Sequence, residues 1–502
     1  MKRIVSTLLL LCLLFMQSPA RSQAEPAINW YEIFVRSYQD SDGDGIGDLQ
    51  GVIGRLDDLV KMGYTGIWLM PVFPSPSYHK YDVSDYMQID QSYGTLDDFR
   101  SLIQKAHEYG IQIIIDLPLN HTSVNHPWFQ EAVQAIKSGV SSPYLSYYCF
   151  RNSYADGYTQ LDGSDWFYEE RFAGGGMPDL NLDEPAVRQE ITRVISFWLG
   201  DMRVDGFRLD AVTNLYTGQT ERNIEFLSWL NQTCKQINPE AYLVGECWAD
   251  LSTIAQYYSS GIDSFFLFPA SQAEGFLISS LRGRSGHAEK FAKQYERVLN
   301  AIPQGILAPF LCNHDTGRTI GAVQGRSNLP AAKFIEGLLN MLNGNVFTYY
   351  GEEIGMVGSG EDPNKRLAMY WNDHDMTQQP PGVTKIEYAY PAYDVQILDP
   401  NSLLQYCINA NHLRLQFPEI STGINEFIYV DGDICLMKRT TDDSSCLIAV
   451  NFSSKDHGEC EIPENWSIAG VLTTTEAMPS MEKSCLRLPP YSIVVLDQTS
   501  GQ

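Results

Sequence analysis

The sequence lacks three features that would each point to a particular class of protein. None of its 10 cysteines forms a Cys-x-x-Cys pair, so a zinc site is not indicated. Its main apolar run, from Leu8 to Met16, is far shorter than the roughly 20 residues of a membrane helix. Basic residues are scarce, because 35 Lys and Arg stand against 61 Asp and Glu, a formal charge of −26. Such a charge repels phosphate backbones and anionic lipids, so neither nucleic acid nor stable membrane insertion is expected.

The N-terminus has the pattern of a secretory signal peptide over residues 1–24. A basic start, Met1-Lys2-Arg3, precedes the apolar run, and Ser22-Gln23-Ala24 offers the small residues of a cleavage site. We therefore expect a mature chain that starts near Glu25 and is secreted to the extracellular space or the periplasm as a soluble monomer. Cys12 follows Leu11 and not a small residue, which disfavours a lipid anchor.

The remaining cysteines do not suggest a simple disulfide framework, because removal of Cys12 leaves an odd number. Cys247 and Cys312 fall at the ends of apolar runs, where a buried thiol acts as a small hydrophobic side chain. Four others cluster near the C-terminus and allow one or two bridges after export: Cys435, Cys446, Cys460 and Cys485. The sequence leaves their pairing open.

Short β-rich runs alternate with amphipathic helical stretches through most of the chain. The runs span residues 28–35, 66–70, 111–117, 206–210, 241–246, 264–268, 308–312 and 346–350. Repeated strand-then-helix order indicates parallel strands, and eight strands close a (β/α)₈ barrel. The sequence therefore predicts an α/β fold built on a TIM barrel.

Two segments depart from this alternation. Residues 122–177 follow the third run, are rich in Tyr, Ser, Gly and Asp, and are too long for an ordinary loop, so we expect a small inserted domain. Residues 419–502 change to short alternating strands with a tight turn at Asp431-Gly432-Asp433, which predicts a C-terminal antiparallel β-sandwich. The barrel is expected over residues 25–121 and 178–418.

Asp210, Glu246 and Asp315 each close one of the strand-like runs. The carboxyl ends of barrel strands form the face on which TIM-barrel active sites are built, so these acids are expected to converge. Two carboxylates that flank one bond are the machinery of glycoside hydrolysis. Arg208, two residues before Asp210 and so on the same strand face, would keep Asp210 ionised. The pattern therefore indicates a glycosidase, and an aromatic content of 12% suits the handling of sugars.

The segment from 40 to 48 resembles the first part of an EF-hand calcium loop. Acids stand at loop positions 1, 3, 5 and 9, a glycine at position 6, and a residue able to offer its carbonyl at position 7. The predicted ligands are Asp40, Asp42, Asp44, Ile46 and Asp48. Position 12, where an EF-hand has its Glu, is Gly51, so we expect a modified loop with a structural calcium ion, magnesium being the alternative.

Four motifs carry a resemblance to the α-amylase family of retaining glycoside hydrolases, glycoside hydrolase family 13. They are DLPLNH at 116–121, GFRLDA at 206–211, GECW at 245–248 and NHD at 313–315. A fifth, MPDLN at 177–181, is similar to the form in members intermediate between oligo-1,6-glucosidases and neopullulanases. The resemblance covers nearly the whole chain after the leader.

The resemblance implies a role for each residue that matches a family motif. Asp210 would be the nucleophile, Glu246 the general acid/base, and Asp315 the carboxylate that holds sugar hydroxyls. Six further residues would contact the substrate: Tyr81, Asp82, His121, Arg208, His314 and Arg366.

Some positions depart from the family pattern. Lys80 stands where relatives usually have Gly, and RLAMYW at 366–371 matches the relatives' segment only loosely. Asp116 and Asn120 are expected to brace the cleft. Asn120 is also a candidate ligand of a second calcium ion, although the sequence offers no partner set for it.

The sequence thus predicts a secreted, calcium-stabilised hydrolase of α-1,4-glucosidic bonds in starch and maltooligosaccharides that forms a covalent glycosyl-enzyme. The main alternative is a neopullulanase, cyclomaltodextrinase or oligo-α-glucosidase that also transfers glycosyl units, since it would use the same catalytic residues. A non-catalytic amylase-like binding protein would not need the three acids. A calcium-dependent adhesion module would not need the barrel pattern.

Overall fold

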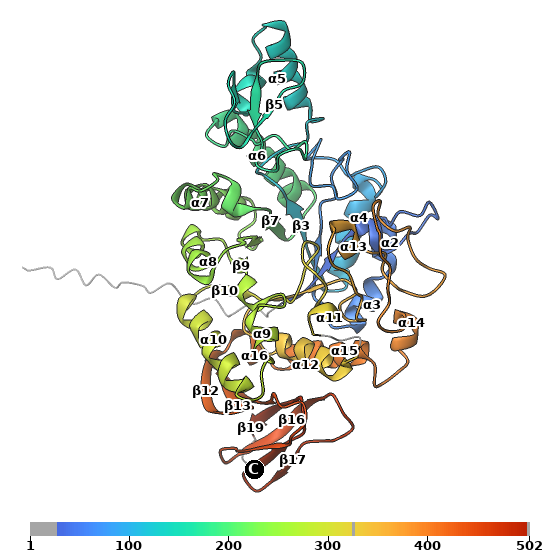
Figure 1. The fold of residues 1–502 in the computed structure, drawn as a ribbon, viewed down its shortest axis with the longest axis vertical. Coiled ribbons are helices and arrows are strands. Elements are labelled where there is room, and N and C mark those ends of the chain that lie inside the picture. Colours follow the sequence, from blue (N-terminus) through green and yellow to red (C-terminus); the bar gives the residue numbers. More distant parts are fainter. Residues whose placement is uncertain (1–27, 324–326, 499–502) are drawn as a thin grey trace, which may run out of the picture.

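The computed structural model describes residues 28–323 and 327–498. The predicted signal peptide, residues 1–24, lies outside these ranges. Figure 1 shows a barrel in the middle of an elongated molecule, with a small inserted segment at one end and antiparallel sheets at the other. Within the described ranges, no helix has both the length and the apolar character needed to cross a membrane.

Eight parallel strands form the central sheet. They are β1 (Asn29–Ile33), β2 (Gly66–Leu69), β3 (Gln112–Leu117), β7 (Gly206–Leu209), β8 (Tyr242–Gly245), β9 (Ser264–Phe266), β10 (Ile306–Ala308) and β11 (Val346–Tyr349). Their order is β10-β9-β8-β7-β3-β2-β1-β11, and each neighbouring pair is parallel. A parallel bridge between Phe310 and Phe347 joins the two ends of the sheet. The predicted TIM barrel is confirmed.

Helices surround these strands (Figure 1). Those of the barrel region are α1 (Val35–Tyr38), α2 (Leu49–Gly54), α3 (Leu56–Lys61), α4 (Leu96–Glu108), α6 (Pro185–Ile195), α7 (Thr220–Ile237), α8 (Leu251–Tyr257), α9 (Phe276–Ser279), α10 (His287–Ala301), α11 (Thr319–Ala322), α12 (Leu329–Asn340), α13 (Asp362–Lys365), α14 (Tyr393–Gln396), α15 (Leu403–Gln416) and α16 (Glu419–Thr422). One turn of π-helix, Ser196–Asp201, extends α6.

Local sequence sets where such a helix starts and which face it buries, as α4 illustrates. Thr95 and Asp98 form a capping box, in which each side chain accepts a hydrogen bond from the other residue's backbone N–H. The buried residues of α4 recur every three or four positions, which turns one stripe toward the barrel. The stripe consists of Phe99, Leu102, Ile103 and Ala106.

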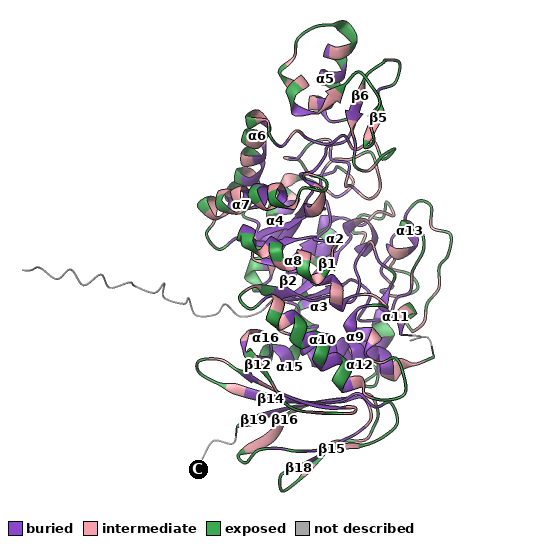
Figure 2. Cartoon of the chain, turned by 60° about the vertical axis from the view of Figure 1, so that its left-hand side comes forward, coloured by how far each residue is buried: buried purple, intermediate pink, exposed green. Residues whose placement is uncertain are grey.

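Aromatic side chains contribute to the barrel core. The Trp30 ring stacks on Tyr242 at 5.3 Å and on Phe347 at 5.8 Å between centroids. This bulk needs a glycine beside it, because a Cβ on Gly66 would lie 2.4 Å from the Trp30 ring. Figure 2 shows the strands as the buried centre of the molecule. Close packing therefore holds the register of the strands from which the site is built.

One predicted strand has different bounds. The run at 308–312 was expected to be a strand that leads to Asp315, but β10 spans Ile306–Ala308. Pro309 follows it and has no N–H to offer a neighbouring strand. Asp315 consequently lies on a loop beyond β10 and does not close a strand, so that part of the prediction is wrong.

The segment between β3 and β7 has secondary structure of its own. It contains α5 (Pro127–Ser138), a 3₁₀ turn (Pro143–Tyr147), and the strands β4 (Phe150–Arg151), β5 (Tyr158–Gln160) and β6 (Phe167–Glu169), arranged as an antiparallel sheet β4-β6-β5. An isolated bridge, His121–Asp179, pairs the residues where this segment leaves and rejoins the barrel, and a second, Tyr148–Leu180, pairs its middle with the returning chain.

The C-terminal part consists of two antiparallel sheets. One has the order β12-β13-β14-β19-β16, from Ile424–Asp431, Ile434–Thr440, Ser445–Asn451, Ser492–Gln498 and Trp466–Thr473. The other has the order β15-β18-β17, from Gly458–Glu461, Cys485–Leu488 and Ser480–Glu482. A hydrophobic cluster joins residues of both sheets, including Leu436, Leu447 and Leu486. The predicted C-terminal β domain is confirmed.

The C-terminal cysteines form no bridge. Cys435 and Cys446 lie on the neighbouring strands β13 and β14 but four residues apart in register. Cys460 and Cys485 lie on β15 and β18 one residue out of register, and so point to opposite faces of their sheet. All nine cysteines in the described ranges are free thiols. The bridges that the sequence allowed are therefore absent there.

Candidate active site

Asp210 and Glu246 directly follow the adjacent parallel strands β7 and β8. The Glu246 N–H continues the ladder by donating to the Leu209 carbonyl at 2.9 Å. The Glu246 carboxylate accepts from the N–H of Ala211 at 3.0 Å. Ala211 has a left-handed backbone with φ of 45°, a conformation that a non-glycine residue adopts only under constraint. The turn after β7 thus brings its own backbone to the carboxylate of the next strand.

Arg208 is the cation at the centre of this acidic cluster. Its side chain is fully buried, and Nη1 donates both to Asp116 Oδ1 at 2.9 Å and to Asp210 Oδ1. Its Nη2 lies 3.1 Å from Glu246 Oε1, an ion pair without hydrogen-bond geometry. One guanidinium therefore contacts three carboxyl groups from three strands or strand ends.

Two of the carboxyl groups around Arg208 have a raised pKa. Burial raises the pKa of Glu246 to about 7 although Arg208 opposes the shift, and the charges of Asp210 and Asp315 add to it. Burial likewise raises the pKa of Asp116 to about 7 against the same guanidinium. A carboxyl group with such a pKa is protonated in about half of the molecules at pH 7, which suits a general acid.

Asp315 sits in a second charged group, with His314 and Arg366. Arg366 Nη2 lies 2.7 Å from Asp315 Oδ1, and His314 Nε2 lies 3.0 Å from Oδ2. Although burial alone would raise it, these two cations hold the pKa of Asp315 well below the usual range. Asp315 is thus ionised at neutral pH.

The His314 ring is held at both nitrogens. Nδ1 contacts Glu32 Oε1 at 2.5 Å and Nε2 lies 2.7 Å from the Tyr81 hydroxyl. Burial opposes a charge on this ring, but Asp315 and Glu32 raise the pKa of His314 to about 10. The Tyr81 hydroxyl also donates to Asp116 Oδ2 at 3.0 Å, which links this group to Arg208.

The structure brings His121 to the Tyr81 loop, and two serine hydroxyls hold Asp82 there. His121 Nε2 lies 3.2 Å from the Tyr81 carbonyl, while Nδ1 has no hydrogen-bond partner in the described ranges. Burial lowers the pKa of His121, so the ring is neutral. Asp82 is buried and accepts from the hydroxyls of Ser75 and Ser77. Arg366, also predicted to contact the substrate, lies beside Asp315.

Asn120 forms a hydrogen bond with the fifth motif. Its Nδ2 donates to Asp179 Oδ1 at 3.0 Å, and the N–H of Arg171 donates to the other oxygen. Burial raises the pKa of Asp179 to about 7. The amide and the carboxyl group therefore join the end of β3 to the segment that returns from the insertion.

Lys80, the departure from the family pattern, keeps the backbone of the glycine it replaces. Its φ is 68°, in the left-handed region that favours glycine. Its ammonium group lies 2.6 Å from Asp90 Oδ2, and both side chains are largely buried. This ion pair compensates for the strain and fixes the loop that carries Tyr81 and Asp82.

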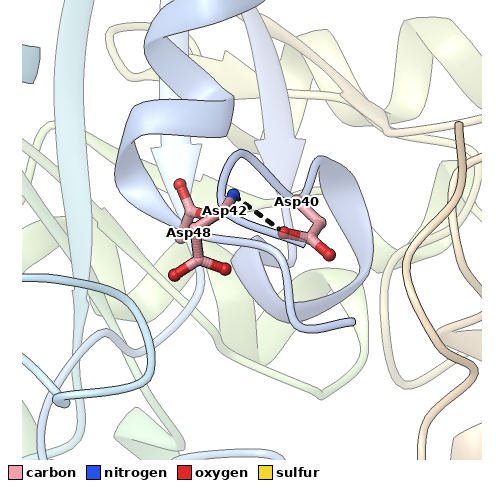
Figure 3. A group of neighbouring side chains, drawn as sticks. All are labelled: Asp40, Asp42 and Asp48. Atoms are coloured by element: carbon pink, nitrogen blue, oxygen red, sulfur yellow. Dashed lines mark hydrogen bonds between the residues drawn. The ribbon is translucent and has the colours of Figure 1, made fainter. Parts of the chain in front are cut away.

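Three of the predicted metal ligands come together. Figure 3 shows Asp40, Asp42 and Asp48 as neighbours in one loop region. One carboxylate oxygen of each lies within 4.8 Å of those of the other two. Calcium–oxygen distances of about 2.3–2.6 Å require such a spread, so the donor set fits this ion. The Asp44 carboxylate is outside the group and accepts from the N–H of Ile46 at 2.7 Å.

Comparison with known proteins identifies the family. A model of the α-amylase catalytic domain matches residues 32–423. The chain belongs to the α-amylase family. Alpha-amylase 3 of Dictyoglomus thermophilum is 35% identical over 485 residues, which cover 93% of this chain and 92% of the relative. A probable oligo-1,6-glucosidase 2 of Bacillus subtilis is 28% identical, over 87% and 91%.

A solved structure agrees with this assignment. Eubacterium rectale Amy13B superposes with a TM-score of 0.91 at 40% identity, over 95% of this chain and 96% of that one. This α-amylase-family chain is a glycoside hydrolase that acts on α-glucans, and it fits the group intermediate between oligo-1,6-glucosidases and neopullulanases.

Sequence reasoning missed two residues around the amylase-family site. Glu32, which holds His314, is an acid within the apolar run of the first strand, and this break in the pattern was the available signal. Trp248, two residues after Glu246, is 52% exposed and stacks on Phe268 at 4.8 Å. The GECW motif contains Trp248, but the sequence gives no sign of its exposure.

Replacement of Arg208 by Met should destabilise this amylase-family protein strongly. It would leave the buried Asp116, Asp210 and Glu246 without their cation, and breaking a buried ion pair costs about 3–5 kcal/mol. The matched control is Arg222→Met, whose pair with Asp183 is on the surface and contributes about 0–1 kcal/mol. Urea denaturation measures both free energies of unfolding, and equal losses would contradict the assigned importance of Arg208.

Proposed function

We propose that the protein is a secreted, retaining α-amylase that hydrolyses α-1,4-glucosidic bonds in starch and maltooligosaccharides. Asp210 attacks the anomeric carbon while Glu246 donates its proton to the glycosidic oxygen, which leaves with the aglycone. In the second step Glu246 takes a proton from water, the water oxygen attacks the anomeric carbon, and Asp210 is released. Configuration is retained because the carbon is inverted twice.

The observation that carries this proposal is that two neighbouring carboxyl groups, those of Asp210 and Glu246, have different surroundings. Retaining hydrolysis needs one ionised carboxylate and one protonated carboxyl group. Asp210 accepts a charge-assisted hydrogen bond from Arg208, which holds and orients its carboxyl group for attack. Glu246 has a pKa of about 7 because it is buried, which favours the protonated form.

The surrounding polar groups suit the binding of a glucosyl unit. The hydroxyl of Tyr81 is occupied by Asp116 and His314, an arrangement that fixes the ring as a platform for the apolar face of a sugar. The Nδ1 atom of His121 lacks a partner, and a sugar hydroxyl would supply the missing hydrogen. Asp315, held by His314 and Arg366, accepts further sugar hydroxyls, and Asp82 meets those of the chain end.

A second candidate function has specific support. The MPDLN segment at 177–181 is similar to that of members intermediate between oligo-1,6-glucosidases and neopullulanases, and one relative is named a probable oligo-1,6-glucosidase. Such an enzyme, or a cyclomaltodextrinase, would use the same Asp210 and Glu246. It would differ in the bond it cleaves and in the transfer of glycosyl units to other sugars.

We further propose a structural calcium ion at Asp40, Asp42 and Asp48, with Asp44 and Ile46 in the same loop. The chain would be cleaved before Glu25 and exported as a monomer. The N-terminal residue of the exported protein would identify the cleavage site. Residues 25–121 and 178–418 would form the barrel domain, 122–177 the inserted domain, and 419–502 the C-terminal domain.

The products and their anomeric form test the proposal. The wild-type enzyme acting on starch should release α-configured maltooligosaccharides of mixed length, followed by NMR. Glu246→Gln should lower kcat by about 10²–10⁴, the usual contribution of a general acid, and Asp210→Asn should abolish turnover. Glu240→Gln, an exposed glutamate before β8, is the control. Panose from pullulan, or glucose as the main product, would favour the second candidate function instead.

The pH dependence should report Glu246. Because this acid must be protonated, kcat/KM for maltooligosaccharides should fall about tenfold per pH unit above pH 7, as Glu246 loses its proton. An α-maltosyl fluoride has a leaving group that needs little protonation, so its glycosylation step should lose this dependence. A basic limb of equal steepness for both substrates would contradict the role of Glu246.

Removal of calcium should lower the melting temperature. An ion that binds only the folded protein stabilises it by about 2.7 kcal/mol at 100 times its dissociation constant. Calorimetric scans with chelator, and again after calcium is restored, measure the shift. Asp42→Asn should abolish most of it, whereas the exposed Asp442→Asn should leave it intact. A scan that chelator does not change would contradict the calcium site.

A further inference from the structure

We propose that a groove on the flank of the barrel binds the reducing-end portion of a long α-glucan, beyond the units next to the cleaved bond. The flank groove is the cavity of about 620 Å³ between the loops after β8 and β9 and the helix α10. It is lined by Trp248, Phe268, Gln272, Glu274, Gln294 and Arg297 among others. The inference rests on the proposed function, because it uses the orientation that the catalytic groups give the substrate.

The flank groove begins beside the catalytic groups. Trp248 lies two residues after Glu246 on the same loop, and half of its surface is exposed. Its ring is nearly parallel to that of Phe268, with 20° between the planes and 4.8 Å between the centroids. Phe268 is buried and supports the indole as an exposed flat surface. A pyranose ring stacks on such a surface through its C–H face.

The chemistry of cleavage decides which part of the substrate passes this way. The groups proposed to hold the sugar that Asp210 attacks lie toward β1, β2 and β11: Tyr81 follows β2, Arg366 follows β11, and His314 contacts Tyr81 and Glu32 of β1. Glu246 donates to the oxygen that leaves with the aglycone. The groove lies on the opposite side, at β8 and β9, and so takes the aglycone.

The groove offers partners for neutral hydroxyl groups. Gln272 has φ of 63°, an uncommon conformation for this residue type, and no hydrogen bond of its side chain occurs in the described ranges. Across the groove, Gln294 on α10 accepts from Arg297 at 3.0 Å, which leaves its amide donors free for a ligand. Amides of this kind both donate to and accept from sugar hydroxyls.

The loop that carries Gln272 is fixed. Arg282 holds both oxygens of Glu274 at 2.9 Å and donates to the Ala273 carbonyl at 2.6 Å. A Cβ on Gly275 would lie 2.1 Å from the Ser271 carbonyl, so only glycine fits the tight turn. The loop thus presents Gln272 without the entropic cost of ordering a mobile segment.

A second hollow of about 500 Å³ lies on the other side of Trp248 and is lined by Gln219 and Thr213 among others. It provides the matched control. Gln219 is exposed and accepts from Arg222 three residues on, as Gln294 accepts from Arg297. The flank groove is the larger hollow and the one bordered by the stacked pair of Trp248 and Phe268, which favours it as the path of the chain.

The test compares the mature enzyme with Gln272→Ala/Gln294→Ala and with Gln219→Ala on substrates of two lengths. For the double variant, kcat/KM should fall about tenfold on maltoheptaose and change less than about twofold on maltotriose, because two hydrogen bonds to distant units are lost. With reducing-end-labelled maltoheptaose, the labelled products should become shorter. Gln219→Ala should match the wild type on both substrates.

Several outcomes would overturn the inference. These are equal losses on both substrates, an unchanged ratio between them, or a length-dependent loss in Gln219→Ala alone, which would place the chain in the second hollow. Failure of the proposed function is a different result, namely no glucan turnover by the wild-type enzyme. Calorimetric binding of maltoheptaose to Asp210→Asn, with and without the two glutamine substitutions, then decides the groove separately, and equal affinities would refute it.

Discussion

The buried guanidinium of Arg208 is the interaction on which the rest of the site depends. It contacts Asp116, Asp210 and Glu246 at once, and without a cation three carboxyl groups would not share so small and dry a space. One cation cannot neutralise three acids, and burial raises the pKa of two of them, Asp116 and Glu246. This shortage of positive charge favours a proton within the cluster, which is the condition that the role proposed for Glu246 requires.

A second cationic group repeats this principle with a different balance. His314 and Arg366 provide two positive charges for Asp315, while Glu32 supports His314 from behind. Here two cations face the Asp315 carboxylate and lower its pKa, so Asp315 is ionised. The Tyr81 hydroxyl forms hydrogen bonds with Asp116 of the first group and with His314 of the second. The two groups, from loops and strands distant in the sequence, are therefore part of one hydrogen-bonded network.

The sequence predicts most strongly where function coincides with local pattern. Asp210 and Glu246 end regular strands, so their convergence follows from the barrel itself. Asp315 also reaches the site, but by a loop that begins at Pro309, and strand periodicity carries no information about such a path. Glu32 and Lys80 are set by partners far along the chain or by a strained backbone angle, which no spacing encodes. The cysteine pairing was open because strand register, which keeps Cys460 and Cys485 on opposite faces, comes from tertiary packing.

The burial of the free thiols affects how readily the protein is oxidised. Seven of the nine cysteines in the described ranges are buried, and burial raises the pKa of Cys234 and Cys247 to about 12. Since the thiolate is the reactive form, the folded protein is a poor target for oxidants. An unfolded chain exposes all of these groups at their ordinary reactivity. The native packing therefore protects the thiols from oxidation. Molecules that fold slowly would be the ones to accumulate oxidised cysteines.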